Sequence, residues 1–147
     1  MDVLFICRKN AERSQMAEIL FNRQSKNSMA LSAGTEVKSS ELQHPPGRII
    51  SELMLNLGYD EVVGKQRKRL TRRMAGNADI IVILLSRREI AASLPKYVRK
   101  IKNIVYWDVG YMPGRIYSAY PPPTYLYHAR QLFRIEALVE DLVRKIG

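Results

Sequence analysis

Short apolar runs alternate along this chain with amphipathic segments. A continuous apolar run is typical of a parallel strand that is covered by helices on both faces. Residues 3–6 and 80–85 are such runs, and residues 28–33 and 103–108 are predicted as two further strands. The longest apolar run, residues 80–85, is far too short to span a bilayer.

The segments between these strands have the period of amphipathic helices. Residues 14–24 are predicted as the first helix. The second helix opens at Pro45-Pro46 and ends at Gly58, because proline favours a first turn and glycine a C-terminal cap. Its predicted buried residues are Ile49, Ile50, Leu53, Met54 and Leu57. Short helices are expected over residues 70–76 and 86–94.

Residues 124–146 are predicted as the closing helix. Its expected inner face consists of Leu126, Arg130, Phe133, Ala137, Leu138, Leu142 and Val143. The chain has two histidines, of which His44 is placed in a loop and His128 on the surface of this helix.

Strands that alternate with helices predict an α/β protein: a three-layer α/β/α domain with a four-stranded parallel sheet, Rossmann-like or flavodoxin-like. The length fits a single domain over residues 1–147, with the first strand central. Ligands of such sheets bind at the carboxyl ends of the strands, where strand order reverses. Cys7 and Asp108 both stand at such an end.

The loop between the first strand and the first helix carries the candidate chemistry. The N–H groups of a helix N-terminus lack partners within the helix and favour an anion, so residues 8–12 can form an anion site. Cations and a helix N-terminus also favour the thiolate of a cysteine, which is its nucleophilic form. Arg13 offers a planar fork that can hold two phosphate oxygens, and the hydroxyl of Ser14 can donate to the Cys7 thiolate.

These residues resemble the loop of the low-molecular-weight protein tyrosine phosphatase family, which shares its fold with thioredoxin-coupled arsenate reductases. The family pattern is Cys-x-Gly-Asn-x-Cys-Arg-Ser, and the chain matches it at Cys7, Asn10, Arg13 and Ser14. Residues 13–18 look most like the arsenate reductase branch, and Ser32-Ala33-Gly34-Thr35 matches a second motif.

The resemblance implies the phosphotyrosine phosphatase I fold and a role for each matched residue. Cys7 attacks phosphorus, Arg13 binds the phosphoryl oxygens, Ser14 stabilises the thiolate and Asn10 braces the loop. The residues of the loop that surround the substrate are then Arg8, Lys9, Asn10, Ala11, Glu12 and Ser14.

Three positions depart from the family pattern. Lys9 replaces the loop glycine, which is tolerable only if the backbone avoids positive φ there. Glu12 replaces the second cysteine. Met112 precedes Pro113 where the family has an Asp-Pro whose aspartate is the general acid, so the proton donor is Asp108, Glu12 or neither. Asp108 can alternatively be a structural cap of its loop.

Five of the eight tyrosines fall between Tyr111 and Tyr127, in and after a loop rich in glycine and proline. Either they pack the last helix onto the sheet, or they form an aromatic wall that favours a flat aryl phosphate.

The chain is basic, with a net charge of +10, and residues 65–73 carry six positive charges. Such a run is either a solvated surface or a site for an anionic substrate or nucleic acid. A single cysteine excludes an internal disulfide and a cysteine-based metal cluster. We expect no metal, no cofactor and no membrane contact, and the absence of a signal-peptide pattern predicts a cytoplasmic protein.

Three functions remain open from the sequence. The first is a cysteine-dependent phosphatase that acts on phosphotyrosine or small aryl phosphates, with inorganic phosphate as a competing ligand. The second is an arsenate reductase that uses an external thiol, because the chain has no further cysteine for thiol exchange. The third is a degenerate module that binds phosphate or nucleic acid without catalysis.

Overall fold

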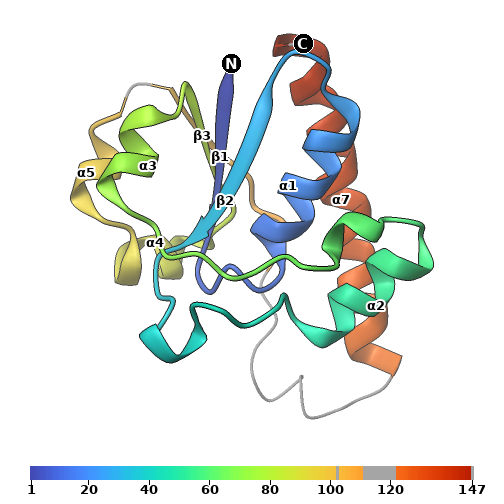
Figure 1. The fold of residues 1–147 in the computed structure, drawn as a ribbon. Coiled ribbons are helices and arrows are strands. Elements are labelled where there is room, and N and C mark those ends of the chain that lie inside the picture. The colour runs from blue at the N-terminus through green and yellow to red at the C-terminus, as the bar shows by residue number, and fades with distance from the viewer. Residues whose placement is uncertain (102, 111–121, 147) are drawn as a thin grey trace.

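A four-stranded parallel sheet forms the centre of the molecule (Figure 1). The computed structural model describes residues 1–101, 103–110 and 122–146. The strand order is β2-β1-β3-β4. The strands are β1 (Asp2–Cys7), β2 (Met29–Gly34), β3 (Ile80–Ile83) and β4 (Ile104–Tyr106). The predicted central position of the first strand is therefore confirmed, and Cys7 pairs in register with Gly34 at the carboxyl end of the sheet.

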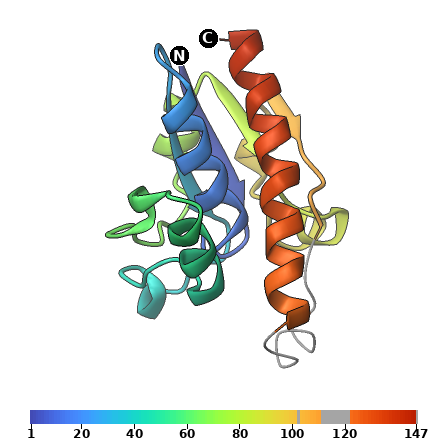
Figure 2. The same ribbon diagram turned by 90° about the vertical axis from the view of Figure 1, so that its right-hand side faces the viewer.

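Helices cover both faces of the sheet, as the apolar runs predicted (Figures 1 and 2). On one face lie α1 (Arg13–Gln24), α2 (Arg48–Asn56) and α7 (Pro122–Ile146). On the other lie α3 (Arg72–Asn77), α4 (Arg87–Ser93) and α5 (Lys96–Arg99). Two short 3₁₀ turns, η1 (Ser39–Glu41) and η2 (Asp60–Val62), flank α2.

Aromatic side chains fill the core beneath α1 and α7. The ring of Phe5 on β1 lies 5.9 Å from that of Phe21 on α1 and 5.7 Å from that of Trp107, just after β4. These contacts fix α1 against the strand that precedes it. Because α1 begins directly after the Cys7 loop, its docking also sets the geometry of that loop.

The predicted inner face of the closing helix is partly wrong: Leu142 is buried and Leu138 and Val143 pack against the core, but the other four residues are exposed. Leu126 and Phe133 are more than half exposed, whereas His128 is buried and not on the surface. The buried residues of α7 are His128, Gln131, Leu132, Ile135, Val139 and Leu142. The prediction placed apolar side chains inward, but two polar residues of α7 turn inward to contact the loops at the end of the sheet.

The second helix begins later than the two prolines indicated. Its first residue is Arg48, after Gly47, and its last is Asn56. Leu57, predicted to be buried, is exposed because it lies beyond the helix end. Among the residues that the structure describes, none of the helices is long and apolar enough to cross a membrane.

Candidate active site

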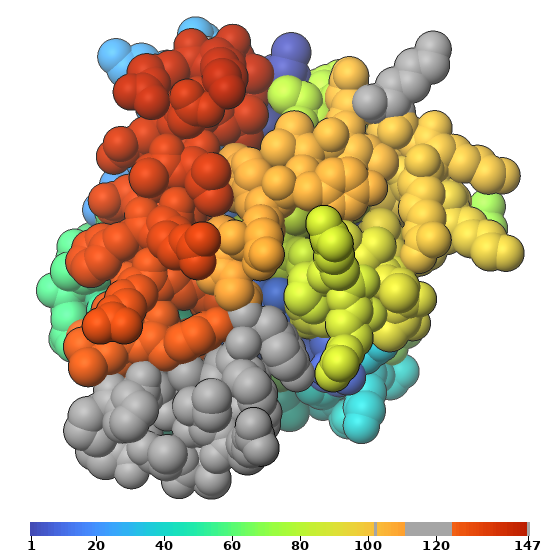
Figure 3. Space-filling model, turned by 180° about the vertical axis from the view of Figure 1, so that it is seen from behind, coloured from blue at the N-terminus to red at the C-terminus, as the bar shows by residue number. Residues whose placement is uncertain are grey.

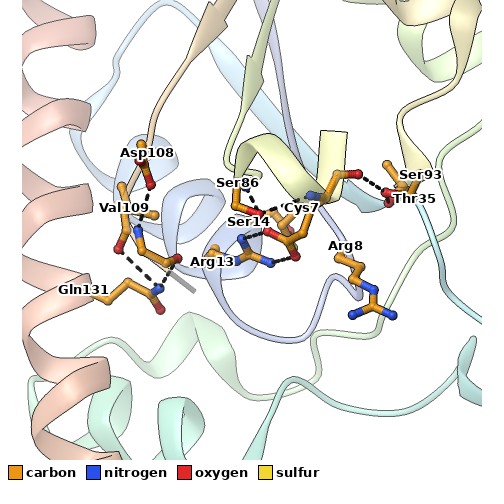
Figure 4. A network of polar contacts seen from close by, with 12 residues as sticks. Cys7, Arg8, Arg13, Ser14, Thr35, Ser86, Ser93, Asp108, Val109 and Gln131 are labelled. Atoms are coloured by element: carbon orange, nitrogen blue, oxygen red, sulfur yellow. Dashed lines mark hydrogen bonds and ion pairs between the residues drawn. The ribbon is translucent and has the colours of Figure 1, made fainter. Parts of the chain in front are cut away.

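The loop between β1 and α1 brings the predicted site residues Cys7, Arg13 and Ser14 together (Figure 4). Cys7 is the last residue of β1 and Arg13 the first of α1. The Cys7 sulfur lies 2.9 Å from the Ser14 hydroxyl, a hydrogen-bond distance for this pair. The thiol is 2% exposed, so the loop shields it from bulk solvent. The hydroxyl is thus placed to stabilise a thiolate, as expected.

Asn10 ties this loop to its neighbours. Its side-chain amide donates to the hydroxyls of Ser14 at 2.8 Å and Ser32 at 2.9 Å. Its Oδ1 accepts from Gln15 Nε2 and from the backbone N–H of Lys68. The bracing role that the resemblance implied for Asn10 matches this geometry.

The backbone of the loop explains why Lys9 can replace the family glycine. Among the described non-glycine residues, Asn10 alone has a positive φ, of 52°. Asparagine tolerates the left-handed region better than most residues. Because the strained conformation falls on Asn10, Lys9 needs no glycine-like freedom.

The second motif, residues 32–35, packs directly against the loop. A Cβ on Gly34 would lie 2.7 Å from the Arg8 carbonyl oxygen and 2.8 Å from the Asn10 nitrogen. The Thr35 N–H donates to the Cys7 carbonyl at 3.0 Å. Only glycine permits this close approach of the two backbones.

Arg13 is held by a carboxylate that sequence reasoning missed. Its two terminal nitrogens donate to the two carboxylate oxygens of Glu89 on α4, at 2.7 and 2.8 Å. Burial disfavours the charged guanidinium, but the bonds to Glu89 and the nearby Cys7 and Glu12 outweigh this effect and raise the pKa of Arg13. This two-point contact fixes the orientation of the guanidinium at the start of α1.

Glu89 is itself fixed by the start of α4. It forms a capping box with Ser86, since Glu89 N donates to Ser86 Oγ and Ser86 N donates to Glu89 Oε1. Burial disfavours the carboxylate, but the Arg13 hydrogen bonds and the capping box hold the pKa of Glu89 below its ordinary value. The Ser-x-x-Glu spacing after the third strand is the signal that could have pointed to Glu89.

Glu12, the last residue of the loop, lies toward α7. Its Oε2 is 3.2 Å from Nδ1 of His128. Burial raises the pKa of the adjacent Tyr127, and the charges of Arg13, Glu12 and Asp108 all act on it. Its ring packs against that of His128, with centroids 5.8 Å apart, and its hydroxyl lies beside Gly110, 2.7 Å from where a Cβ on that glycine would stand.

Asp108 follows β4, so it lies at the same carboxyl end of the parallel sheet as Cys7 (Figure 4). Its Oδ1 accepts from the backbone N–H of Gly110 at 3.3 Å, and the residue is exposed. Gln131 on α7 donates to the Gly110 carbonyl at 3.1 Å. Figure 3 shows α7 and α4 on either side of the segment that runs from β4 to Gly110. Met112, Pro113 and the tyrosines between residues 111 and 121 lie outside the described residues.

The side chains of Arg8 and Lys9 lie apart from the thiol. Arg8 pairs with Glu36 at 2.7 Å, and its guanidinium points away from Cys7 (Figure 4). Lys9 lies 3.6 Å from Glu41. The Ala11 carbonyl accepts from Gly47 N, so Ala11 contributes its backbone to the loop packing.

Much of the basic run at residues 65–73 holds the structure together. Lys65 and Lys68 both pair with Glu18, whose side chain is 1% exposed. Arg67 pairs with Glu41. These contacts fasten the run beside the Asn10 brace. Among the described residues, no three or more His, Cys, Asp or Glu side chains gather so that they could hold a metal ion.

A family model of the low molecular weight phosphotyrosine protein phosphatases matches residues 2–146. The chain belongs to this family. The sequence resemblance and the predicted fold class are therefore confirmed. No curated protein matches the chain.

Solved structures of both branches of the low molecular weight phosphatase family are similar to the chain. An arsenate reductase from Archaeoglobus fulgidus is 28% identical, with a TM-score of 0.68 over 96% of this chain and 98% of that one. A low molecular weight protein tyrosine phosphatase from T. tengcongensis is 23% identical, with a TM-score of 0.72 over 99% of both chains. One from Streptococcus pyogenes is 18% identical, with a TM-score of 0.73 over 99% of this chain and 93% of that one.

Proposed function

We propose that the protein is a cysteine-dependent phosphatase that hydrolyses phosphotyrosine or small aryl phosphates. The observation that carries the proposal is the arrangement of the thiol. The Cys7 sulfur contacts the Ser14 hydroxyl, and the Arg13 fork, at the end of the same loop, is fixed by Glu89 on α4. A nucleophile, a hydroxyl that stabilises its thiolate and a cation for the phosphoryl oxygens are the parts that such a reaction needs.

The reaction has two steps. In the first, the Cys7 thiolate attacks phosphorus, an S–P bond forms, and the P–O bond to the leaving group breaks as the leaving oxygen takes up a proton. In the second, water attacks the phosphocysteine, the S–P bond breaks, and phosphate leaves with Cys7 again a thiolate. Arg13 and the backbone N–H groups of residues 8–12 stabilise the charge on the transferring oxygens in both steps.

A phosphorylated protein or a small phosphomonoester is the substrate class that fits this site. The ring of Tyr127 packs against His128, which lies beside Glu12 of the loop, and an aromatic side chain at this place favours an aryl group. Inorganic phosphate binds as a competitor, and nucleic acid is not favoured because much of the basic run pairs within the protein. We propose a cytoplasmic location, where phosphoproteins are abundant.

Arsenate reduction is the second candidate function. The 28% identity to an arsenate reductase favours it. The single cysteine of the chain counts against it, because electron transfer by thiol exchange then needs a thiol from outside. We rank it below the phosphatase.

Hydrolysis of p-nitrophenyl phosphate in the presence of a chelator tests the proposal. We expect turnover in the wild type, loss of it in Cys7→Ser, and competitive inhibition by phosphate. Arsenate with glutathione or thioredoxin is assayed in parallel. Thiol-dependent arsenite formation without phosphatase turnover would favour the reductase, and phosphate binding without either activity would favour a receptor.

A further inference from the structure

We propose that Glu12 and His128 form a proton-donating pair that protonates the leaving oxygen of the substrate. This inference rests on the proposed phosphatase function and deepens it. It assigns the step for which the family's Asp-Pro has no counterpart at Met112-Pro113, and it uses a residue at which the chain departs from the family pattern.

The position of Glu12 brings a carboxylate to the edge of the loop. Glu12 is the last residue of the loop, directly before Arg13, and it is the N-cap residue of α1. Its side chain makes no capping hydrogen bond to α1. It extends past Gly47, where a Cβ would lie 3.4 Å from Glu12 Cγ, and its Oε2 lies 3.2 Å from His128 Nδ1. The carboxylate thus serves the contact with α7 and not the helix start.

The exposed fractions of the Glu12 and His128 side chains suit a proton donor that reaches the substrate and a buried residue that positions it. The side chain of Glu12 is 23% exposed, whereas that of His128 is 2% exposed. Burial of a polar ring is costly unless it gains a polar contact. The Glu12 carboxylate is a charged group close to this ring, with Oε2 3.2 Å from Nδ1, at a helix face whose other buried residues include Leu132 and Ile135.

The surrounding contacts hold His128 at a fixed place beside the loop. Its ring packs edge-on against Tyr127, with centroids 5.8 Å apart. Nearly one turn later, Gln131 binds the Gly110 carbonyl. These contacts fix this part of α7 relative to the end of β4. His128 is therefore a positioning residue for Glu12.

Glu12 gives up one proton in the first chemical step and takes one back in the second. The first step requires a proton on the Glu12 carboxyl, whose Oε2 lies 3.2 Å from His128 Nδ1. As the P–O bond breaks, this proton passes from the Glu12 carboxyl to the leaving oxygen, which leaves a carboxylate beside a neutral imidazole. In the second step, the attacking water returns a proton to Glu12 as its oxygen bonds to phosphorus.

Asp108, the other candidate for the proton donor, makes a different contact. Its carboxylate accepts a hydrogen bond from Gly110 N in its own loop, which is the contact expected of a loop cap.

The test is the dependence of kcat/KM on the leaving group, because kcat/KM reports the first chemical step. Phenyl phosphate needs protonation of its leaving oxygen far more than 2,4-dinitrophenyl phosphate does. For Glu12→Gln, we expect kcat/KM to fall about 10²-fold or more with phenyl phosphate and only a few-fold with the dinitrophenyl ester. Glu12→Asp should recover part of the loss, and His128→Gln should show a smaller change in the same direction.

The matched control is Glu140→Gln, the same substitution at an exposed position of α7, which should leave both rates unchanged. Alkylation of Cys7 by iodoacetate shows whether the loop is intact in each variant. Equal losses with both esters, or no loss, in a folded Glu12→Gln would overturn the proposal, as would a steeper leaving-group dependence in Asp108→Asn alone. The phosphatase function itself fails only if the wild type is inactive or Cys7→Ser stays active.

Discussion

Asn10 meets both the backbone and the hydrogen-bonding requirements of the Cys7 loop. It adopts the positive φ that the loop needs, and its side chain contacts the first helix, the second strand and the segment at Lys68. Buried polar groups that lose their partners cost free energy on top of the lost hydrogen bond. The residue is therefore a structural centre of the site although it does not touch phosphorus.

Replacing Asn10 should affect both stability and activity. We expect Asn10→Ala to lower the free energy of unfolding by about 3 kcal/mol, because Ser14, Ser32, Gln15 and the Lys68 N–H each lose one hydrogen bond and because alanine tolerates the left-handed region less well than asparagine. Urea unfolding at neutral pH measures this loss. Asn10→Gly relieves the backbone strain but does not restore the side-chain hydrogen bonds. It should therefore recover only a small part of the lost unfolding free energy. Full recovery in Asn10→Gly would show that the bonds contribute little.

At the scale of elements, the active loop depends on α4 from the opposite face of the sheet. The capping box of Ser86 and Glu89 starts α4 and holds the carboxylate that fixes Arg13. Removing one partner of a buried ion pair leaves the other charge uncompensated. We therefore expect Glu89→Gln to cost about 3–5 kcal/mol of unfolding free energy and to weaken phosphate binding.

The pH dependence of this pair has a defined sign. The pKa of Glu89 is lowered in the folded protein, so its contribution to stability is complete above the ordinary glutamate value of about 4.3 and is lost as the pH falls through the folded pKa. The stability difference between wild type and Glu89→Gln should therefore be constant near neutrality and shrink below about pH 4. Urea midpoints across acidic pH measure it. A difference that grows on acidification would contradict the pairing.

The elements that the sequence predicted well are those with a strong local signal. The two apolar runs, the two further strands, the Gly34 motif and the Cys7 loop are local features, and all took the predicted places. The errors arose where distant contacts decide. Leu126 was expected inside and His128 outside, but His128 is buried beside Glu12, which is far away in the sequence. Glu89 was missed for the same reason, since its partner is 76 positions away.

At the scale of the whole molecule, the net charge of +10 does not by itself indicate a nucleic-acid surface. Two lysines of the basic run converge on the buried carboxylate of Glu18, and the run also supplies the backbone N–H that Asn10 accepts. Part of the charge therefore fastens the loop at the carboxyl end of the sheet. The remaining excess favours the approach of an anionic substrate.

Cys7 is proposed to be the nucleophile that carries the phosphoryl group. This role can be measured by acid quench of the wild type during turnover of an aryl phosphate, followed by mass spectrometry of the Cys7 peptide. We expect a phosphoryl adduct on Cys7 in the wild type and none in Cys7→Ser, which should also be inactive. Turnover that continues in Cys7→Ser, with no adduct on the wild-type peptide, would show that Cys7 is not the nucleophile.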